Sequence, residues 1–256
     1  MSTVALTREE SSFSARVMNL LERVDYRLAL TDEEKQEIYH LRYNAYLREG
    51  AISPNFARRL SDEYDDLDNS WVFGVFVDGH LASSIRLNVS SAAYPRSPAL
   101  ATFNDVLGAE LAAGKIIVDP TRFVVDHRFS RLYPDLRYAT TRIAWMAMAF
   151  FNGDLLLASV RSEHQAFYRR VFGHEVVCDP RPYHTLLKPL SLMVCDYARQ
   201  REAVPQRFPF FRSTYFERRM LFGYPVAEEA WAPDEGERRQ ALRAVGMERK
   251  VSALAG

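Results

Sequence analysis

Apolar and aromatic positions predict a pair of adjacent strands in the first half of the chain. Residues 71–77 (WVFGVFV) and 80–89 (HLASSIRLNV) are both rich in strand-forming side chains, and Asp78-Gly79 separates them. An Asp-Gly pair supplies the positive φ angles that a two-residue hairpin turn requires. We therefore expect an antiparallel β-hairpin over these residues.

A helical period precedes this hairpin, over residues 31–50. Thr31 stands where an N-cap is expected, Glu34 follows three residues later as its capping-box partner, and Gly50 ends the segment. The apolar positions that share one helical stripe are Ile38, Leu41 and Ala45. The segment is therefore predicted to be a helix that packs through this stripe.

The rest of the pattern alternates between strands and helices. Strands are expected over residues 24–30, 115–126, 154–160, 174–177 and 185–195, and helical segments near 55–60, within 90–113, and over 136–154 and 162–173. Three consecutive strands in the middle of this order predict a mixed, twisted central sheet flanked by helices. The fold class is therefore α+β, with an α/β three-layer architecture.

Composition places the chain among globular proteins. It has 256 residues, 48% of them hydrophobic, and Lys+Arg 33 balances Asp+Glu 33, so the formal net charge is zero. This balance argues against a nucleic-acid partner, which needs a basic surface. We expect an N-terminal arm at residues 1–20, a single domain at 21–225 and a charged tail at 226–256.

The N-terminal residues 1–21 carry early acidic side chains and no continuous apolar segment, so a signal peptide is not expected there. The most apolar helical stretch, residues 143–151, is too short to span a bilayer. We therefore expect a cytoplasmic protein without a transmembrane segment, and peripheral membrane contact stays open.

Cysteine and histidine spacing does not predict a metal site. Cys178 and Cys195 match neither a CxxC pair nor a zinc knuckle, and buried free thiols are the ordinary alternative. The histidines at 127, 164, 174 and 184 show no ligand spacing on one helix. We expect no metal and no bound cofactor.

The element order resembles the GNAT acyltransferase superfamily, and so does the segment EHQAFYRRVFGHEVV. In that superfamily a helical tyrosine, here Tyr168, stands shortly before a glycine, here Gly173. The usual glycine-rich loop that binds the coenzyme A pyrophosphate at a helix N-terminus has no counterpart in residues 126–140. The resemblance therefore implies a GNAT-like acyl-CoA N-acyltransferase fold, with a donor other than free acetyl-CoA.

Four short motifs, in the family's order, resemble the acyl-homoserine-lactone synthases and the related N-acyl amino acid synthases. The motifs are Arg42 with Tyr46, Asp62-Glu63-Tyr64-Asp65, Arg86-Leu87 and Asp119-Pro120-Thr121-Arg122, the last with Asp where the family has Glu. The lactone synthases usually carry a Trp in the loop after the first helix, and residues 51–53 contain none. The resemblance covers residues 24–195 and is nearer to the N-acyl amino acid synthase branch.

This resemblance implies transfer of a long-chain fatty acyl group from an acyl carrier protein thioester to the α-amine of an amino acid. The donor is then the acyl-phosphopantetheine of the carrier protein. Arg128, Arg131, Arg137 and Arg142 replace the glycine-rich loop and form a candidate docking patch for this acidic partner. The fatty chain is expected against apolar side chains such as Trp145 and Met148, which are otherwise core residues.

The acceptor side of the site is expected at the acidic run that precedes the hairpin. Asp62 and Asp65 are three residues apart and would share one face of a helical turn, ordered by Arg42 or Arg86. Carboxylates can hold the ammonium of an amino acid and arginines its carboxylate. The alternatives are a solvated acidic loop for the run and a surface ion pair for Arg86.

Asp119 is the candidate general base, and Arg122 and Arg86 complete the catalytic set with Tyr168. Residues three apart on a regular strand point to opposite faces, so Asp119 and Arg122 can serve one site only across a bulge, which Pro120 favours. An aspartate needs a raised pKa to act as a base. A strand-end salt bridge for Asp119 and a core position for Tyr168, which would otherwise protonate the leaving thiol, stay open.

Two other functions remain as alternatives. One is an acyl-homoserine-lactone synthase that uses S-adenosylmethionine as its acceptor. The other is an acyl-binding module without catalysis, because the base is Asp rather than Glu and the glycine-rich loop is missing. An acetyl-CoA N-acetyltransferase is disfavoured by the same missing loop.

Overall fold

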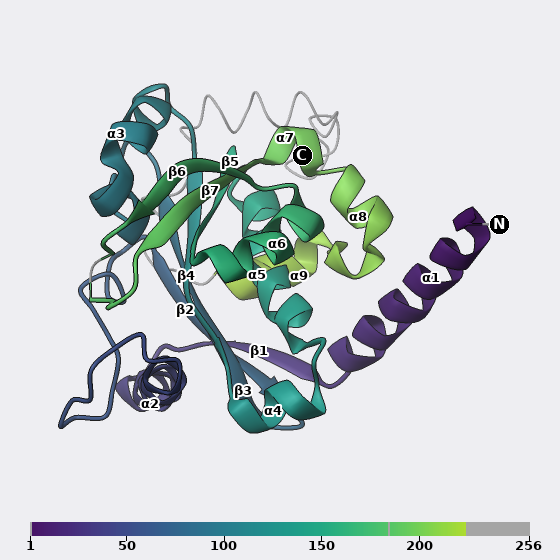
Figure 1. Ribbon diagram of the computed structural model, residues 1–256, viewed down its shortest axis with the longest axis horizontal. Coiled ribbons are helices and arrows are strands. Elements are labelled where there is room, and N and C mark those ends of the chain that lie inside the picture. The colour runs from purple at the N-terminus through teal and green to yellow at the C-terminus, as the bar shows by residue number, and fades with distance from the viewer. Residues whose placement is uncertain (1, 184, 224–256) are drawn as a thin grey trace, which may run out of the picture. The chain divides into compact units, whose positions relative to one another are not determined.

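The computed structural model describes residues 2–183 and 185–223, with side chains from residue 12 onward (Figure 1). A seven-stranded sheet runs in the order β1-β2-β3-β4-β5-β7-β6. Only β4 and β5 are parallel, and all other neighbours are antiparallel. The strands are β1 (Val24–Leu28), β2 (Ser70–Val77), β3 (His80–Ser90), β4 (Ile117–Val125), β5 (Leu155–Val160), β6 (Glu175–Arg181) and β7 (Leu190–Asp196).

Helices cover both faces of this sheet, which makes three layers (Figure 1). The helices are α1 (Ser2–Leu21), α2 (Asp32–Arg48), α3 (Pro98–Ala112), α4 (His127–Leu132), α5 (Leu136–Phe150), α6 (Ser162–Phe172), α7 (Tyr197–Gln200), α8 (Ala203–Arg207), η1 (Pro209–Phe211) and α9 (Tyr215–Phe222). Alternation along the strands assigns the faces: Val72 packs with Ile38 of α2, whereas Trp71 contacts Phe151 after α5. The mixed, three-layer sheet expected from the sequence is confirmed.

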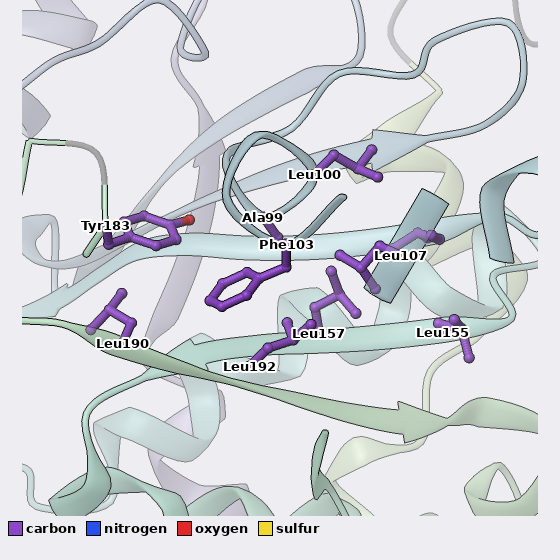
Figure 2. Close-up of a cluster of buried hydrophobic side chains, with 10 residues drawn as sticks. Ala99, Leu100, Phe103, Leu107, Leu155, Leu157, Tyr183, Leu190 and Leu192 are labelled. Atoms are coloured by element: carbon purple, nitrogen blue, oxygen red, sulfur yellow. The ribbon is translucent and has the colours of Figure 1, made fainter. Parts of the chain in front are cut away.

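The cores beneath α2 and α3 are separate clusters on one sheet face. Figure 2 shows the cluster under α3, where Leu100, Phe103 and Leu107 meet leucines of β5 and β7. The α2 cluster contains Ile38 and Tyr39 with Val72 of β2. Both helices are thus anchored by apolar contact with the sheet, and the space between them is free for polar side chains.

The two strongest local predictions are confirmed. Asp78 (φ 50°) and Gly79 (φ 80°) form the two-residue turn between β2 and β3. Helix α2 begins with a capping box, in which Glu34 N donates to Thr31 Oγ1 (3.3 Å) and Thr31 N donates to Glu34 Oε2 (3.0 Å). Both signals depend only on neighbours in sequence, so no tertiary contact overrides them.

The helical turn predicted near residues 55–60 is wrong. The Asn55 side chain bonds both the N–H and the carbonyl of Arg59, and Leu60 N donates to Tyr39 O of α2. These bonds occupy backbone groups that a helix would use internally. The prediction for residues 90–113 was too short, because Ser97 caps a 15-residue helix, α3, with Pro98 in its first turn.

The expected arm and the last part of the expected domain both contain helices that the pattern did not predict. The N-terminal arm is helical, and its last turns bury Val17 and Leu20 and lie against α5 and η1. After β7 the chain forms α7, α8, η1 and α9, which bury Phe210 and Phe211. The tail at 226–256 lies outside the described residues. None of the described helices has the length and apolarity needed to cross a membrane.

Candidate active site

The centre of the sheet opens where its two parallel strands diverge. β4 and β5 pair only at Ile117 with Leu155 and at Val118 with Leu156. Beyond these pairs lies a cavity of 410 Å³ whose walls come from β4, β5, the end of α2, α6 and the loop before β7. From Asp119 onward β4 has no ladder partner on its β5 side. The two parallel strands therefore leave an open slot between them.

A bulge in β4 brings Arg122 to the same sheet face as the acidic residues. Ser84 pairs with Val124 and Arg86 with Thr121, so two β4 residues face one residue of β3. Arg122 has φ 53° and turns its side chain toward Asp62. The bulge was expected at Pro120, but Pro120 stays in register with Leu87. A proline is tolerated there because β5 has already separated from that side of β4.

Three arginines and two aspartates form a buried charge cluster on this face. Arg42 Nη1 bonds Asp65 Oδ1 at 2.6 Å, and Arg86 Nη1 lies 2.5 Å from Asp62 Oδ1 and 3.1 Å from Asp65 Oδ1. Arg122 Nη2 bonds Asp62 Oδ2 at 2.5 Å. All five side chains are at most 5% exposed. With every group ionised, the cluster carries one net positive charge.

The acidic run is therefore divided between the interior and the surface. Asp65 N donates to Asp62 O (3.1 Å), and Asp62 N donates to Asp65 Oδ2 (2.9 Å), so one tight turn aims both carboxylates inward. Glu63 and Asp66 point outward to Arg96 and Lys35. Asp62 and Asp65 are thus not part of a solvated acidic loop, and Arg86 is not in a surface ion pair.

Burial and charge act against each other in this cluster. Burial alone would raise the pKa of Asp62, but Arg86 and Arg122 outweigh it and hold that pKa well below its ordinary value. Burial lowers the pKa of Arg42 despite its bond to Asp65. Arg42 Nε and Nη2 are buried and donate to no acceptor among the described residues. These two Arg42 nitrogens are therefore available to donate hydrogen bonds to a further acceptor.

Asp119 is buried at the N-terminus of α3. Its side chain is on the face of Asp62 and Asp65, fully enclosed, and its Oδ2 accepts a hydrogen bond from Ala99 N at 2.9 Å. Burial raises the pKa of Asp119 to about 6, although the Ala99 N–H, Ser97 and Arg86 oppose the shift. It forms no ion pair with any described residue, so it is not in a strand-end salt bridge. Asp119 is also absent from the cavity wall.

Tyr46 at the end of α2 and Tyr168 of α6 both line the cavity. The Arg122 guanidinium lies 5.5 Å from the Tyr46 ring centre, which links the charge cluster to the cavity. Burial raises the pKa of Tyr168, so its phenol stays protonated at neutral pH. Tyr168 is therefore placed as a wall residue rather than in the core.

The four arginines predicted to dock a partner do not share one surface. Arg128 and Arg131 lie exposed on α4, and Arg137 lines the cavity. Arg142 is buried: it donates to the carbonyls of Phe210 and Arg212 and pairs with Glu217 of α9 at 2.5 Å. Including Arg142 in the patch was wrong, because its guanidinium ties α5 to the C-terminal helices.

Other wall residues were missed or misplaced by the sequence. Trp145 and Met148 are core residues of α5 and do not line the cavity. The cations that line it besides Arg122 and Arg137 are Arg48, Arg161 and Lys188. Its apolar wall includes Phe123, Val125, Phe167, Leu186 and Leu190. No local motif marks these residues, since tertiary packing alone brings them together.

Comparison with known proteins gives one family match. The family model described as N-acyl amino acid synthase FeeM matches residues 37–196, more than half of the chain, and this range contains every residue predicted for the site. No curated protein sequence matches the chain. The solved structures of similar fold include an N-acyl amino acid synthase and two lactone synthases.

FeeM, an N-acyl amino acid synthase from uncultured soil microbes, superposes with a TM-score of 0.60 at 20% identity, over 73% of this chain and 98% of FeeM. BjaI, a CoA-dependent acyl-homoserine lactone synthase solved with SAM and isopentyl-CoA, gives 0.50 at 14% identity, over 73% and 89%. The lactone synthase LasI gives 0.50 at 16% identity, over 67% and 89%. The fold is therefore the GNAT-like N-acyltransferase fold that the sequence motifs indicated.

Proposed function

Because the chain belongs to the N-acyl amino acid synthase family and is an N-acyltransferase, we propose that it moves a long-chain fatty acyl group from acyl carrier protein to the α-amine of an amino acid. The product is an N-acyl amino acid. The observation that carries this proposal is the cavity between β4 and β5, with the buried Arg–Asp cluster reaching its wall through Arg122.

The donor enters between the separated strands as an acyl-phosphopantetheine thioester. Arg137 and Lys188 line the cavity, and Arg128 and Arg131 lie exposed on the adjacent helix α4. Positive charge at this position favours an acidic carrier protein. Residues 126–140 contain no glycine-rich pyrophosphate loop, which favours the carrier protein over free coenzyme A. An unpaired backbone N–H of β4 can stabilise the thioester oxyanion.

The acceptor lies against the wall formed by Tyr46 and Arg122. The charge cluster carries one net positive charge, which favours the carboxylate of an amino acid. Asp62 and Asp65 hold Arg42, Arg86 and Arg122 in place. The cluster therefore orients the acceptor so that its α-amine faces the thioester in the slot.

The reaction conserves atoms and charge as follows. The α-ammonium gives one proton to Asp119, whose pKa of about 6 suits a base at neutral pH. The amine then forms a bond to the thioester carbon, and the C–S bond breaks. Tyr168 protonates the leaving thiolate and regains a proton from the nitrogen, which becomes the amide. Asp119 later releases its proton to solvent.

The test is a mass-spectrometric assay with long-chain acyl carrier protein and the twenty amino acids. We expect one N-acyl amino acid, which disappears in Asp119→Ala while circular dichroism remains unchanged. Parallel reactions contain long-chain acyl-CoA as donor or S-adenosylmethionine as acceptor. Product from acyl-CoA alone would contradict the proposed donor, and a lactone formed only with S-adenosylmethionine would contradict the proposed acceptor.

A further inference from the structure

The proposed base has no direct access to the cavity, although buried polar atoms lie in its neighbourhood. Asp119 Oδ1, Asn88 Oδ1, Ser159 Oγ and the Tyr183 hydroxyl are all buried and form no hydrogen bond of good geometry among the described residues, although Ser159 and Tyr183 are near enough to interact. A buried polar atom without a partner is uncommon and needs a reason. These four atoms belong to four separate segments of the chain.

All four side chains belong to the sheet face beneath α3. Ile117 of β4 and Leu157 of β5 lie in the cluster under α3, so Asp119 and Ser159, two residues further along each strand, point to the same face. Asn88 is the register partner of Asp119 on β3. Figure 2 shows the Tyr183 hydroxyl pointing toward Ala99, whose backbone N–H binds Asp119.

Ser159 connects this group of polar atoms with the cavity. It lies on the cavity wall, whereas Asp119 and Tyr183 do not. Burial raises the pKa of Tyr183 well above its ordinary value, with a further increase from the charge of Asp119 and an opposing effect of the Ser159 hydroxyl. The phenol therefore stays neutral and is close to both groups. Rotation of a hydroxyl or one bridging water can complete each link.

We propose that Ser159 and Tyr183 relay the amine proton from the cavity to Asp119. The inference rests on the proposed function and deepens it. The α-ammonium gives one proton to Ser159 Oγ, Ser159 passes its own proton to the Tyr183 oxygen, and Tyr183 passes its proton to Asp119 Oδ1. Both hydroxyls are restored, and the carboxylate gains one proton. The reverse sequence returns this proton to the cavity after acyl transfer.

The relay also explains the position of the aspartate. The bond from Ala99 N holds its Oδ2 against the first turn of α3, away from the cavity wall. That bond and the enclosed position keep Asp119 fixed, so a substrate amine cannot reach it directly. Tyr183 packs with Phe103 at a ring-centre distance of 6.4 Å, which fixes the phenol from the other side.

The kinetic test removes each hydroxyl while retaining its packing. We expect Tyr183→Phe and Ser159→Ala to lower kcat about 10²-fold, with little change in KM for the acyl carrier protein. Ser84→Ala is the matched control, since Ser84 Oγ is also buried without a partner but lies outside the cavity wall. It should retain the kcat of the unmodified enzyme.

A double variant separates a relay from a structural role. In the background of Asp119→Asn, Tyr183→Phe should cause no further loss, because both side chains act on one proton path. If the kcat losses of the two single variants multiply in the double variant, the relay is overturned. An unchanged kcat in Tyr183→Phe would overturn it as well.

An NMR titration tests the link without relying on turnover. With ¹³C-labelled aspartate, the Asp119 signal is assigned by its loss in Asp119→Asn and should titrate near pH 6. Removing a phenol that donates to the carboxylate should raise this midpoint by about 0.5 unit or more in Tyr183→Phe. An unchanged midpoint would overturn the relay even if N-acyl amino acid forms. A raised midpoint with no product would support the link and reject the proposed function.

Discussion

At the scale of single residues, the site depends on charges that are buried but matched. Asp65 is fully enclosed and bonds both Arg42 and Arg86, whereas its neighbour Asp66 pairs with Lys35 at the surface. Breaking a buried pair leaves the remaining charge without compensation, and breaking a surface pair leaves it in water. Two adjacent aspartates therefore have different energetic roles.

Asp65→Asn should destabilise the protein by about 3–5 kcal/mol, since Arg42 and Arg86 would lose a buried counter-charge. The matched change Asp66→Asn should cost less than about 1 kcal/mol. Urea unfolding followed by circular dichroism measures both. Equal losses in the two variants would show that the buried cluster does not depend on its charge balance.

In the proposed mechanism, Asp119 couples activity and stability to pH in opposite directions. Its pKa is raised from 3.8 to about 6 in the folded state, so the folded protein binds the proton more tightly than the unfolded chain. Its ionisation therefore reduces stability as pH rises from about 4 to about 6, by about 3 kcal/mol for a shift of roughly two units. The groups that face it are Arg86, Asn88, Tyr183 and the first turn of α3.

Asp119→Asn should accordingly retain only a small residual activity and yet be more stable than the unmodified protein at pH 8. The stability difference between the two proteins should decrease toward pH 4, where the aspartate is protonated in both states. Thermal unfolding across this range, with acyl-transfer assays at each pH, measures both effects. A stability difference that does not depend on pH would contradict the raised pKa.

At the scale of elements, backbone conformation decides which side chains reach the site. The bulge at Arg122 adds one residue to β4 and turns the guanidinium to the face of Asp62. The Asp78-Gly79 turn and one extra β3 residue between Leu81 and Ser83 together set the register that pairs Arg86 with Val72. Both devices need positive φ, and the turn uses the residue type that adopts it most readily.

Gly79→Ala should therefore destabilise the hairpin by about 1–2 kcal/mol, because φ is 80° there although no atom lies within 4 Å of the new methyl group. Gly108→Ala is the matched control inside α3, where φ is not positive and the nearest atoms belong to the exposed side chain of Asn104. It should stabilise the protein by about 0.5–1 kcal/mol. Urea midpoints that shift in the same direction would reject this account.

At the scale of the whole molecule, the cavity lies beside a surface that carries exposed cations on α4. Arg128 and Arg131 are both exposed, whereas the buried Arg142 connects α5 with α9. Charges at the edge of an interface mainly affect association rate and its dependence on salt. If the donor is the proposed acidic carrier protein, its binding should therefore respond to changes on α4 without any change in the chemical step.

The paired change Arg128→Glu and Arg131→Glu should raise KM for acyl carrier protein about tenfold at low salt, with kcat unchanged. Arg199→Glu is the control, since Arg199 is equally exposed on α7 and is not part of the cavity wall. Steady-state kinetics at several salt concentrations measure the effect. The same KM increase in both proteins would contradict docking at α4.

The sequence alone determined features that depend on near neighbours: the Asp-Gly hairpin, the capping box of α2, the order of the strands along the chain and the four motifs that gave the family. Only the tertiary structure decided which groups surround each side chain. Arg142 is buried in the interior, Asp119 bonds the first turn of α3, and the bulge lies at Arg122 rather than at the expected Pro120. Local signals specify backbone conformation, whereas the surroundings of a side chain depend on strands and helices that are distant in the chain.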